Sequence, residues 1–233
     1  MRDQVAEHLL DMIASGDYEV GELLPPERVL VEELGVSRTV IREALNLLET
    51  RGLLQIEHGR GATVAANGSR AVHDNLRILM RVQPGTLWEL METRKVLEVE
   101  VAGLAAQRAT AEDKAAMRAA LERMRDKIDA PEGYVEADVE FHDLLVRSAH
   151  NRVFLMTIEP ITGLLLASRT MTGSVSDNAR RALKAHEAIL ERVEAGDAEG
   201  ARREMLEHML VTERDIRTTV GEQGKTDHLS GKG

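Results

Sequence analysis

Apolar side chains recur at helical spacing through the N-terminal part of the chain, interrupted by two short breaks. This periodicity predicts a helix from Gln4 to Ser15, a second from Pro26 to Leu34 and a third from Arg38 to Arg51. Ser37 is a suitable N-cap for the third helix, and Gly52 suits its C-terminal end. The N-terminal part therefore begins with three short helices.

The pattern changes after Gly52. Apolar and polar residues alternate over 53–57 and again over 62–65, on either side of a glycine-rich segment, His58–Gly61. Alternation around a glycine-rich turn predicts a β-hairpin. Three helices followed by such a hairpin are typical of a winged helix-turn-helix, whose third helix lies in the major groove of DNA. We predict this domain over residues 1–70.

Cationic and hydroxyl side chains lie where such a domain contacts DNA. Ser37 lies at the start of the third helix, and Arg38, Thr39 and Arg42 occupy its first turns and project off its apolar stripe. All four are candidates for DNA contact. Recognition helices reach base edges and phosphates from these positions. Arg60 lies on the hairpin tip, where it can contact a phosphate or enter a minor groove. The alternative interpretation is an arginine-bearing surface helix in an unrelated domain.

From residue 71 onward the pattern indicates helices alone. About seven are expected, over residues 72–82, 87–109, 111–128, 132–149, 153–171, 178–195 and 198–220. Pro160 should kink the helix in which it lies. The predicted fold is mainly α, with an antiparallel all-α bundle over residues 71–220 whose interior is large enough for a ligand. The polar tail, residues 221–233, is expected to be disordered.

The charge is negative, which is unusual for a DNA-binding protein. The chain carries a net charge of −10, and residues 1–70 contain seven arginines, no lysine and twelve acidic residues. DNA binding must therefore rest on a local cluster of Arg28, Arg38, Arg42 and Arg60, with acidic side chains turned away, and on dimerisation. The absence of cysteine excludes disulfides. Without a signal peptide or a membrane-spanning run, we expect a cytoplasmic protein.

Four residues of the bundle combine metal-binding chemistry with inward positions. Asp138 and His142 are one turn apart on the apolar stripe of one helix, and His186 and His208 lie on the stripes of two others. A lone buried histidine is usually a hydrogen-bonded core residue, but this set is harder to explain in that way. Three imidazoles and one carboxylate suit a divalent metal, zinc most readily, with nickel or cobalt as alternatives.

Arg94 also lies on an apolar stripe, and a buried cation needs a partner. That partner is either a carboxylate on a neighbouring helix or the carboxylate of a ligand bound at the metal. Arg169 is a second, weaker candidate for the ligand site, and a solvated or interface arginine is the alternative there.

The segments LPPERVLVEELGVSRTVIREALNLLETRGLL and HGRGATVA resemble the GntR family of bacterial transcription regulators. The resemblance implies DNA contacts by Arg28, Arg38, Arg42 and Gly61. Pro26 departs from the family pattern, which more often has a small hydroxyl residue or alanine there. That departure alters one helix cap and no base contact.

Residues 72–220 resemble the C-terminal effector domain of FadR-type GntR regulators, called FCD, in the segments DVEFH, HEAIL and MLEHM. The resemblance implies a metal held by Asp138, His142, His186 and His208. It also places Arg94 toward the effector cavity. A fatty-acyl-CoA effector is disfavoured, because members that bind one depart from the metal pattern.

These features predict a ligand-responsive DNA-binding transcription regulator rather than an enzyme. It should bind a near-palindromic operator as a homodimer, under control of a small carboxylate such as a hydroxy or sugar acid. A metalloenzyme is the first alternative, although no inward general base accompanies the four ligands and it leaves the winged helix unexplained. A constitutive DNA-binding protein with a structural metal is the second.

Overall fold

The computed structural model describes residues 1–57, 59–65, 69–83, 85–164 and 176–230. The chain divides into two compact units, Met1–Asn75 and Leu76–Gly233. This division lies a few residues beyond the predicted boundary at residue 70. Within the described part of the chain, no helix combines the length and apolar character needed to cross a membrane.

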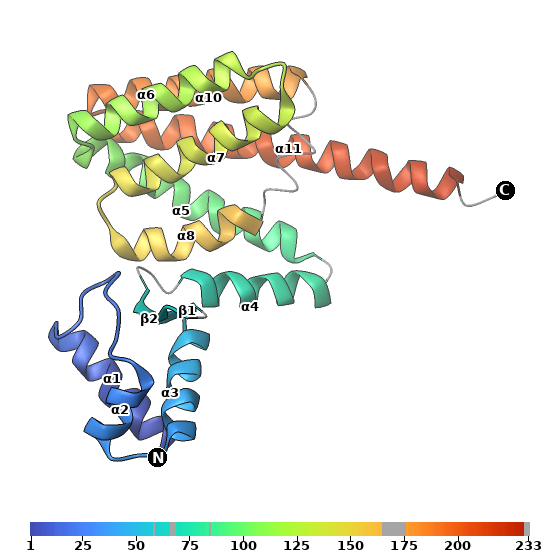
Figure 1. The fold of residues 1–233 in the computed structure, drawn as a ribbon. Helices are drawn as coiled ribbons and strands as arrows, with labels where there is room; N and C mark the ends of the chain where they lie inside the picture. Colours follow the sequence, from blue (N-terminus) through green and yellow to red (C-terminus); the bar gives the residue numbers. More distant parts are fainter. Residues whose placement is uncertain (58, 66–68, 84, 165–175, 231–233) are drawn as a thin grey trace. The chain divides into compact units, whose positions relative to one another are not determined.

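The N-terminal unit has the predicted winged helix-turn-helix architecture (Figure 1). Its elements are α1 (Arg2–Ser15), α2 (Glu27–Leu34), α3 (Arg38–Thr50), β1 (Leu54–Glu57) and β2 (Gly61–Val64). The two strands pair antiparallel, with Leu54 opposite Val64. The loop before α2 extends this small sheet, because Leu23 bridges Thr63 and the Gly21 amide donates to the Val64 carbonyl at 2.9 Å.

Local sequence signals fix the ends of the recognition helix α3. The Ser37 hydroxyl accepts a hydrogen bond from the Val40 amide at 3.4 Å, so Ser37 is the predicted N-cap. Gly52 follows the helix with a φ of 75°, a conformation that glycine adopts without strain. Pro26 differs from expectation, because it is the N-cap of α2 rather than a member of its first turn. Its extended ψ of 147° precedes the helix, and its missing N–H costs no helical hydrogen bond there.

The apolar faces of these elements meet in one core. Its buried members are Val5, Ala6, Leu9, Leu24, Leu30, Ile41, Ala44, Leu45, Leu48, Leu54, Ala62 and Val64. The core faces of α1, α2 and α3 are therefore aliphatic, and the charged side chains of α3 are left on the opposite face.

The C-terminal part of the chain is helical, as predicted. Its helices are α4 (Ser69–Val82), α5 (Thr86–Arg108), α6 (Ala111–Asp126), α7 (Pro131–Ser148), α8 (Arg152–Leu164), α10 (Ser176–Ala195) and α11 (Ala198–Ser230). Pro160 lies inside α8, and the rest of the predicted helix over 153–171 falls outside the described residues. In contrast to the disordered tail expected from residue 221, α11 continues to Ser230. No proline interrupts this segment, and most of its residues are tolerated in helices.

In the C-terminal unit, α5 packs against α7, α8, α10 and α11, and α6 packs against α7 and α10. The core between them consists mainly of leucine, isoleucine, valine, alanine and methionine. Several polar side chains are buried with these apolar ones: Thr86, Arg94, Glu98, Asp138, His142, Ser148, Thr162, His186 and His208. Buried polar groups need partners. Thr86 and Ser148 find them in nearby backbone carbonyls, whereas Arg94, Glu98, Asp138 and the three histidines lie near one another.

Candidate metal centre and DNA-binding surface

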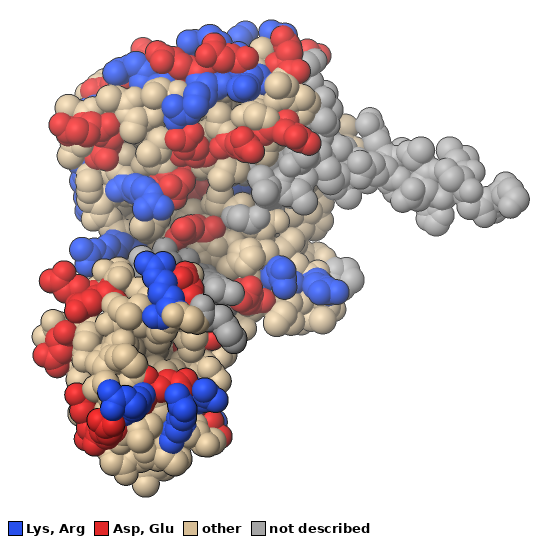
Figure 2. Space-filling model, in the orientation of Figure 1, with Lys and Arg blue, Asp and Glu red and all other residues tan. Residues whose placement is uncertain are grey.

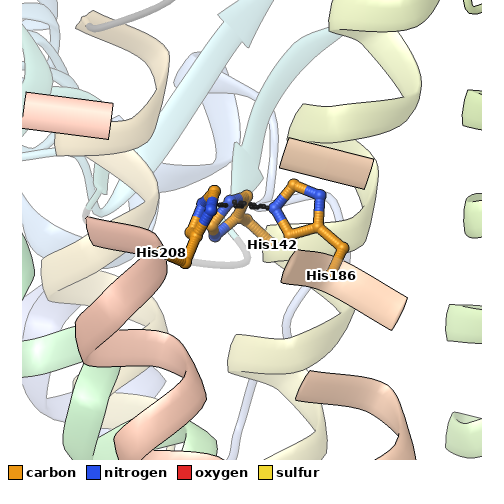
Figure 3. Close-up of side chains that lie close together, drawn as sticks. All are labelled: His142, His186 and His208. Carbon is orange, nitrogen blue, oxygen red and sulfur yellow. Dashed lines mark hydrogen bonds between the residues drawn. The ribbon is translucent and has the colours of Figure 1, made fainter. Parts of the chain in front are cut away.

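Three imidazole rings meet in the interior of the C-terminal unit (Figure 3). His142 comes from α7, His186 from α10 and His208 from α11, and all three are buried. Nε2 of His186 lies 3.2 Å from Nε2 of His142 and 3.2 Å from Nε2 of His208. The structure thus brings together three of the four ligands that helical periodicity predicted, although they are distant in sequence.

This spacing fits a shared metal ion. Tetrahedral zinc with Zn–N bonds of about 2.0–2.1 Å separates its nitrogen ligands by about 3.3–3.4 Å. A neutral imidazole has one donor and one acceptor nitrogen, so three converging Nε2 atoms cannot all satisfy one another by hydrogen bonding. One cation can accept all three lone pairs. The donor set fits zinc, nickel or cobalt.

Asp138 lies beside the three rings. It precedes His142 by one turn of α7, and its Oδ1 is 3.7 Å from Nε2 of His186. The carboxylate is largely buried. Asp138 thus lies next to the histidine cluster, although the group of ligand atoms within 4.8 Å of one another consists of the three histidines alone among the described residues. Its role as a fourth ligand stays a prediction.

Burial keeps the third histidine in the form that binds a metal. Burial in the core, followed by the neighbouring His186 and His142 rings, lowers the pKa of His208 well below its ordinary value. A neutral imidazole offers a lone pair, whereas an imidazolium does not. At neutral pH His208 is therefore ready to coordinate.

A buried carboxylate that the sequence analysis overlooked supports this cluster. Glu98 of α5 lies with its Oε2 2.7 Å from Nδ1 of His142, and its Oε1 accepts a hydrogen bond from Nε of Arg94 at 2.5 Å. Both side chains of the Arg94–Glu98 pair are only 2% exposed. A carboxylate on the far nitrogen of a ligating histidine fixes the orientation of the ring and its Nε2. Glu98 therefore belongs to the site without being a ligand.

The charges around Glu98 keep it ionised. Burial alone would raise the pKa of Glu98, but the Arg94 guanidinium and then His142 hold it well below the ordinary value. Glu98 lies on the same helix as Arg94, so this pair comes in addition to the two kinds of partner expected from the sequence. Their four-residue spacing is the signal that could have identified the pair from sequence.

A cavity opens beside the histidines. Its lining residues are Arg94, Tyr134, Val135, Asp138, His142, Asn178, Ala179, Ala182, His208, Thr212 and Asp215. Arg94 therefore contacts both Glu98 and this cavity, so the two interpretations of Arg94 are compatible. Arg169, the second effector candidate, lies outside the described residues.

The arginines of the recognition helix are exposed and held in place by a glutamate. Arg38 and Arg42 are 67% and 60% exposed, and both donate through Nε to Glu27 of α2. Ser37 and Thr39 are also exposed. Figure 2 shows basic and acidic side chains next to one another on this unit. The expectation that acidic residues turn away from the arginine cluster is therefore wrong. The physical reason is that a carboxylate between two guanidinium groups reduces the repulsion between them.

The other two arginines of the expected cluster, Arg28 and Arg60, also form ion pairs with glutamates. Arg28 pairs with Glu32 at 2.9 Å, and Arg60 pairs with Glu57 at 3.2 Å. Gly61 begins β2 with a φ of 111°, a conformation that an L-amino acid with a side chain rarely adopts. The wing thus presents an exposed arginine next to a position that requires glycine.

Known proteins match both units. Residues 1–64 match the family described as bacterial regulatory proteins, gntR family, and residues 89–210 match the FCD domain. The putative L-lactate dehydrogenase operon regulatory protein of Escherichia coli K12 is 31% identical over 90% of this chain and 83% of its own length. The HTH-type transcriptional regulator LutR of Bacillus subtilis is 29% identical over 85% of this chain and 93% of its own length. A solved structure, Streptococcus agalactiae GntR, superposes with a TM-score of 0.75 at 26% identity, covering 92% of this chain and 99% of that one.

Proposed function

This chain belongs to the gntR family of bacterial regulatory proteins and carries an FCD domain, and from that premise we propose that a small carboxylic acid, bound at a metal in the C-terminal bundle, controls its binding to DNA. The chain is a DNA-binding transcription regulator and not an enzyme. The metal, the acid and the near-palindromic form of the operator are what we add to that identification. We also propose the cytoplasm as the compartment, because that is where a bacterial operator is found.

One observation carries the proposal, namely the convergence of His142, His186 and His208 next to a cavity that Arg94 also lines. The three histidines and Asp138 would hold the ion. The ion would supply a Lewis-acidic position for a carboxylate oxygen. Arg94 would orient the same carboxylate by a charge-assisted hydrogen bond.

The size of the cavity and the names of the relatives favour a compact hydroxy acid. The cavity next to Arg94 and the histidines is small, about 40 Å³, which suits a short acid at that position. A wider pocket of about 330 Å³ shares Ala182, His208, Thr212 and Asp215 with it. One relative is named for the L-lactate dehydrogenase operon, and lactate is a 2-hydroxy acid. A hydroxyl next to the carboxylate can chelate a metal together with it. We therefore expect a short hydroxy or sugar acid as the effector.

The effector has to act on DNA binding through a difference in affinity. A ligand shifts an equilibrium between two arrangements only by binding them unequally. In a homodimer, two winged helices contact the two halves of a near-palindromic operator, so a change in their separation alters operator affinity. We propose this arrangement for the present chain.

The test combines a panel of acids with chelation. Purified protein is loaded with zinc, nickel or cobalt, and its melting temperature and operator binding are measured with short hydroxy acids, sugar acids and unsubstituted fatty acids. The proposal expects one class of hydroxy acid to raise the melting temperature and change operator affinity, and a chelator to abolish both effects. Turnover of the acid would overturn the proposal that the acid is an effector. If no acid has an effect, the metal has a structural role only.

Arg94→Met separates the effector role of Arg94 from its structural role. We expect this variant to melt at a lower temperature, because buried Glu98 loses its arginine. Below that temperature it should keep its metal and basal operator binding but lose the response to the acid. Arg118→Met is the matched control, because Arg118 forms an exposed ion pair with Glu194 in the same unit. Unfolding of Arg94→Met without ligand would assign Arg94 to the core ion pair alone. A response like that of the wild type would remove Arg94 from the effector site.

A further inference from the structure

Glu27 connects the two helices of the helix-turn-helix through its side chain. Its Oε1 and Oε2 lie 2.9 and 3.0 Å from Nε of Arg42, and Oε2 also lies 3.0 Å from Nε of Arg38. The Glu27 side chain is 29% exposed, much less than the arginines that it holds. A carboxylate at the first residue of α2 is thus fixed against the exposed face of α3.

The atoms used in these contacts decide what remains available for DNA. Each hydrogen bond between Glu27 and the arginines uses Nε. A guanidinium carries five N–H donors, of which Nε supplies one. The two terminal nitrogens of each arginine can therefore donate end-on to O6 and N7 of a guanine, the commonest specific contact in the major groove. Arg38 and Arg42 are one helical turn apart, so two such contacts would lie close together along the groove.

The same carboxylate limits the charge of this surface. The hydrogen bond from Arg42, followed by that from Arg38, outweighs burial and lowers the pKa of Glu27, so the side chain is ionised at neutral pH. Two cations with one bound anion attract phosphates less strongly than two free cations. Binding to DNA of any sequence depends mainly on that attraction.

We propose that Glu27 is a positioning residue for operator recognition. It holds Arg38 and Arg42 by Nε so that their terminal nitrogens meet base edges, and it lowers affinity for DNA without the operator sequence. Glu27 itself contacts no base in this proposal. It acts on specificity through the two arginines.

The test measures specificity rather than affinity alone. A duplex selected from a random library by the wild-type protein and a scrambled duplex are bound at several salt concentrations by the full chain and its variants. Glu27→Gln removes the charge, and Glu27→Asp keeps the charge but shortens the side chain by one methylene. Glu43→Gln is the matched control. Glu43 is an exposed residue of α3 and has no ion pair with Arg38 or Arg42 among the described residues.

The specificity ratio is the affinity for the selected duplex divided by that for the scrambled duplex. We expect this ratio to fall about tenfold in Glu27→Gln, which is the effect of losing one good base contact. Binding of the scrambled duplex should tighten, and its salt dependence should steepen by about one phosphate contact. Glu27→Asp should also lower the ratio, because the shorter side chain cannot span both arginines. Glu43→Gln should leave the ratio within about twofold of the wild type, although it makes the same change in charge.

Three results would overturn the proposal. A ratio in Glu27→Gln equal to that in Glu43→Gln would show that charge alone matters. If the ratio is lowered in Glu27→Gln but unchanged in Glu27→Asp, the charge at position 27 sets specificity and the length of the side chain does not. Equal loss of affinity for both duplexes together with a lowered melting temperature would assign Glu27 to folding. If Glu27→Gln does not fold, the Glu27→Asp arm decides.

Discussion

A carboxylate paired with arginine occurs in both units, near the surface in one and inside the core in the other. Glu27 pairs with Arg38 and Arg42, whose side chains are more than half exposed. Glu98 pairs with Arg94 and lies 2.7 Å from His142, where all three side chains are 2% exposed. The chemistry of the two clusters is similar, and their surroundings are opposite.

The surroundings decide what each cluster can do. An exposed ion pair contributes little to stability. The arginines can therefore keep Glu27 at Nε while their terminal nitrogens bind and release DNA at little cost. A buried cluster cannot lose one member without leaving an uncompensated charge in a medium of low polarity. The surface cluster is therefore suited to reversible binding of DNA, and the buried cluster to holding a fixed geometry around a ligand.

The largest expected effect comes from removing the carboxylate of each cluster. Glu98→Ala should lower the free energy of unfolding of the C-terminal unit by about 3–5 kcal/mol, because it removes the buried carboxylate that pairs with Arg94 and lies against His142. Glu27→Ala should cost about 1 kcal/mol or less. Trp88, the only tryptophan of the chain, lies in α5, so its fluorescence in urea reports on the C-terminal unit. Calorimetry of the full chain reports on the variant at position 27. Equal losses in the two variants would contradict the comparison.

Removing a metal ligand should have the next largest effect. Protein purified without chelator should carry about one divalent ion per chain, and His208→Ala should lose most of it. An ion present at a hundred times its dissociation constant stabilises the folded form by about 2.7 kcal/mol, so the melting temperature should fall accordingly. His8→Ala, which alters an exposed histidine of α1, is the control. Elemental analysis that finds the wild type empty after addition of zinc, nickel and cobalt would refute the site.

Truncating one arginine of the surface cluster should change binding but not folding. Arg38→Ala should weaken a selected operator by about 1–3 kcal/mol if Arg38 makes a bidentate contact with a base. The melting temperature should stay near that of the wild type, because the side chain is 67% exposed. Operator affinity equal to that of the wild type in a gel-shift titration would remove Arg38 from the interface.

The smallest effect is expected at the wing. Arg60 is 73% exposed and pairs only with its neighbour Glu57 among the described residues. If it contacts a phosphate, Arg60→Ala should weaken selected and scrambled duplexes alike and lower the salt dependence by about one phosphate contact. A change in sequence preference would instead indicate that Arg60 reads the minor groove.

Helical periodicity correctly predicted which faces of the helices are buried. It predicted that Asp138, His142, His186 and His208 point inward, and all four are buried. It also predicted the cap at Ser37, because capping depends only on residues within the same turn. The end of α11 was harder to predict, since a polar segment with glycines can be either a helix or a tail.

Residue order was enough to predict the two-part architecture, the recognition helix and the inward faces that carry the histidines. These features depend on the order of residues along one segment. The roles of Glu27 and Glu98 depend on tertiary contacts. Glu27 of α2 contacts Arg38 and Arg42 of α3. Glu98 of α5 contacts His142 of α7. A charged side chain has no fixed partner in an unfolded chain. Its partner is set by the packing of apolar faces, which brings together groups whose separation in sequence carries no signal.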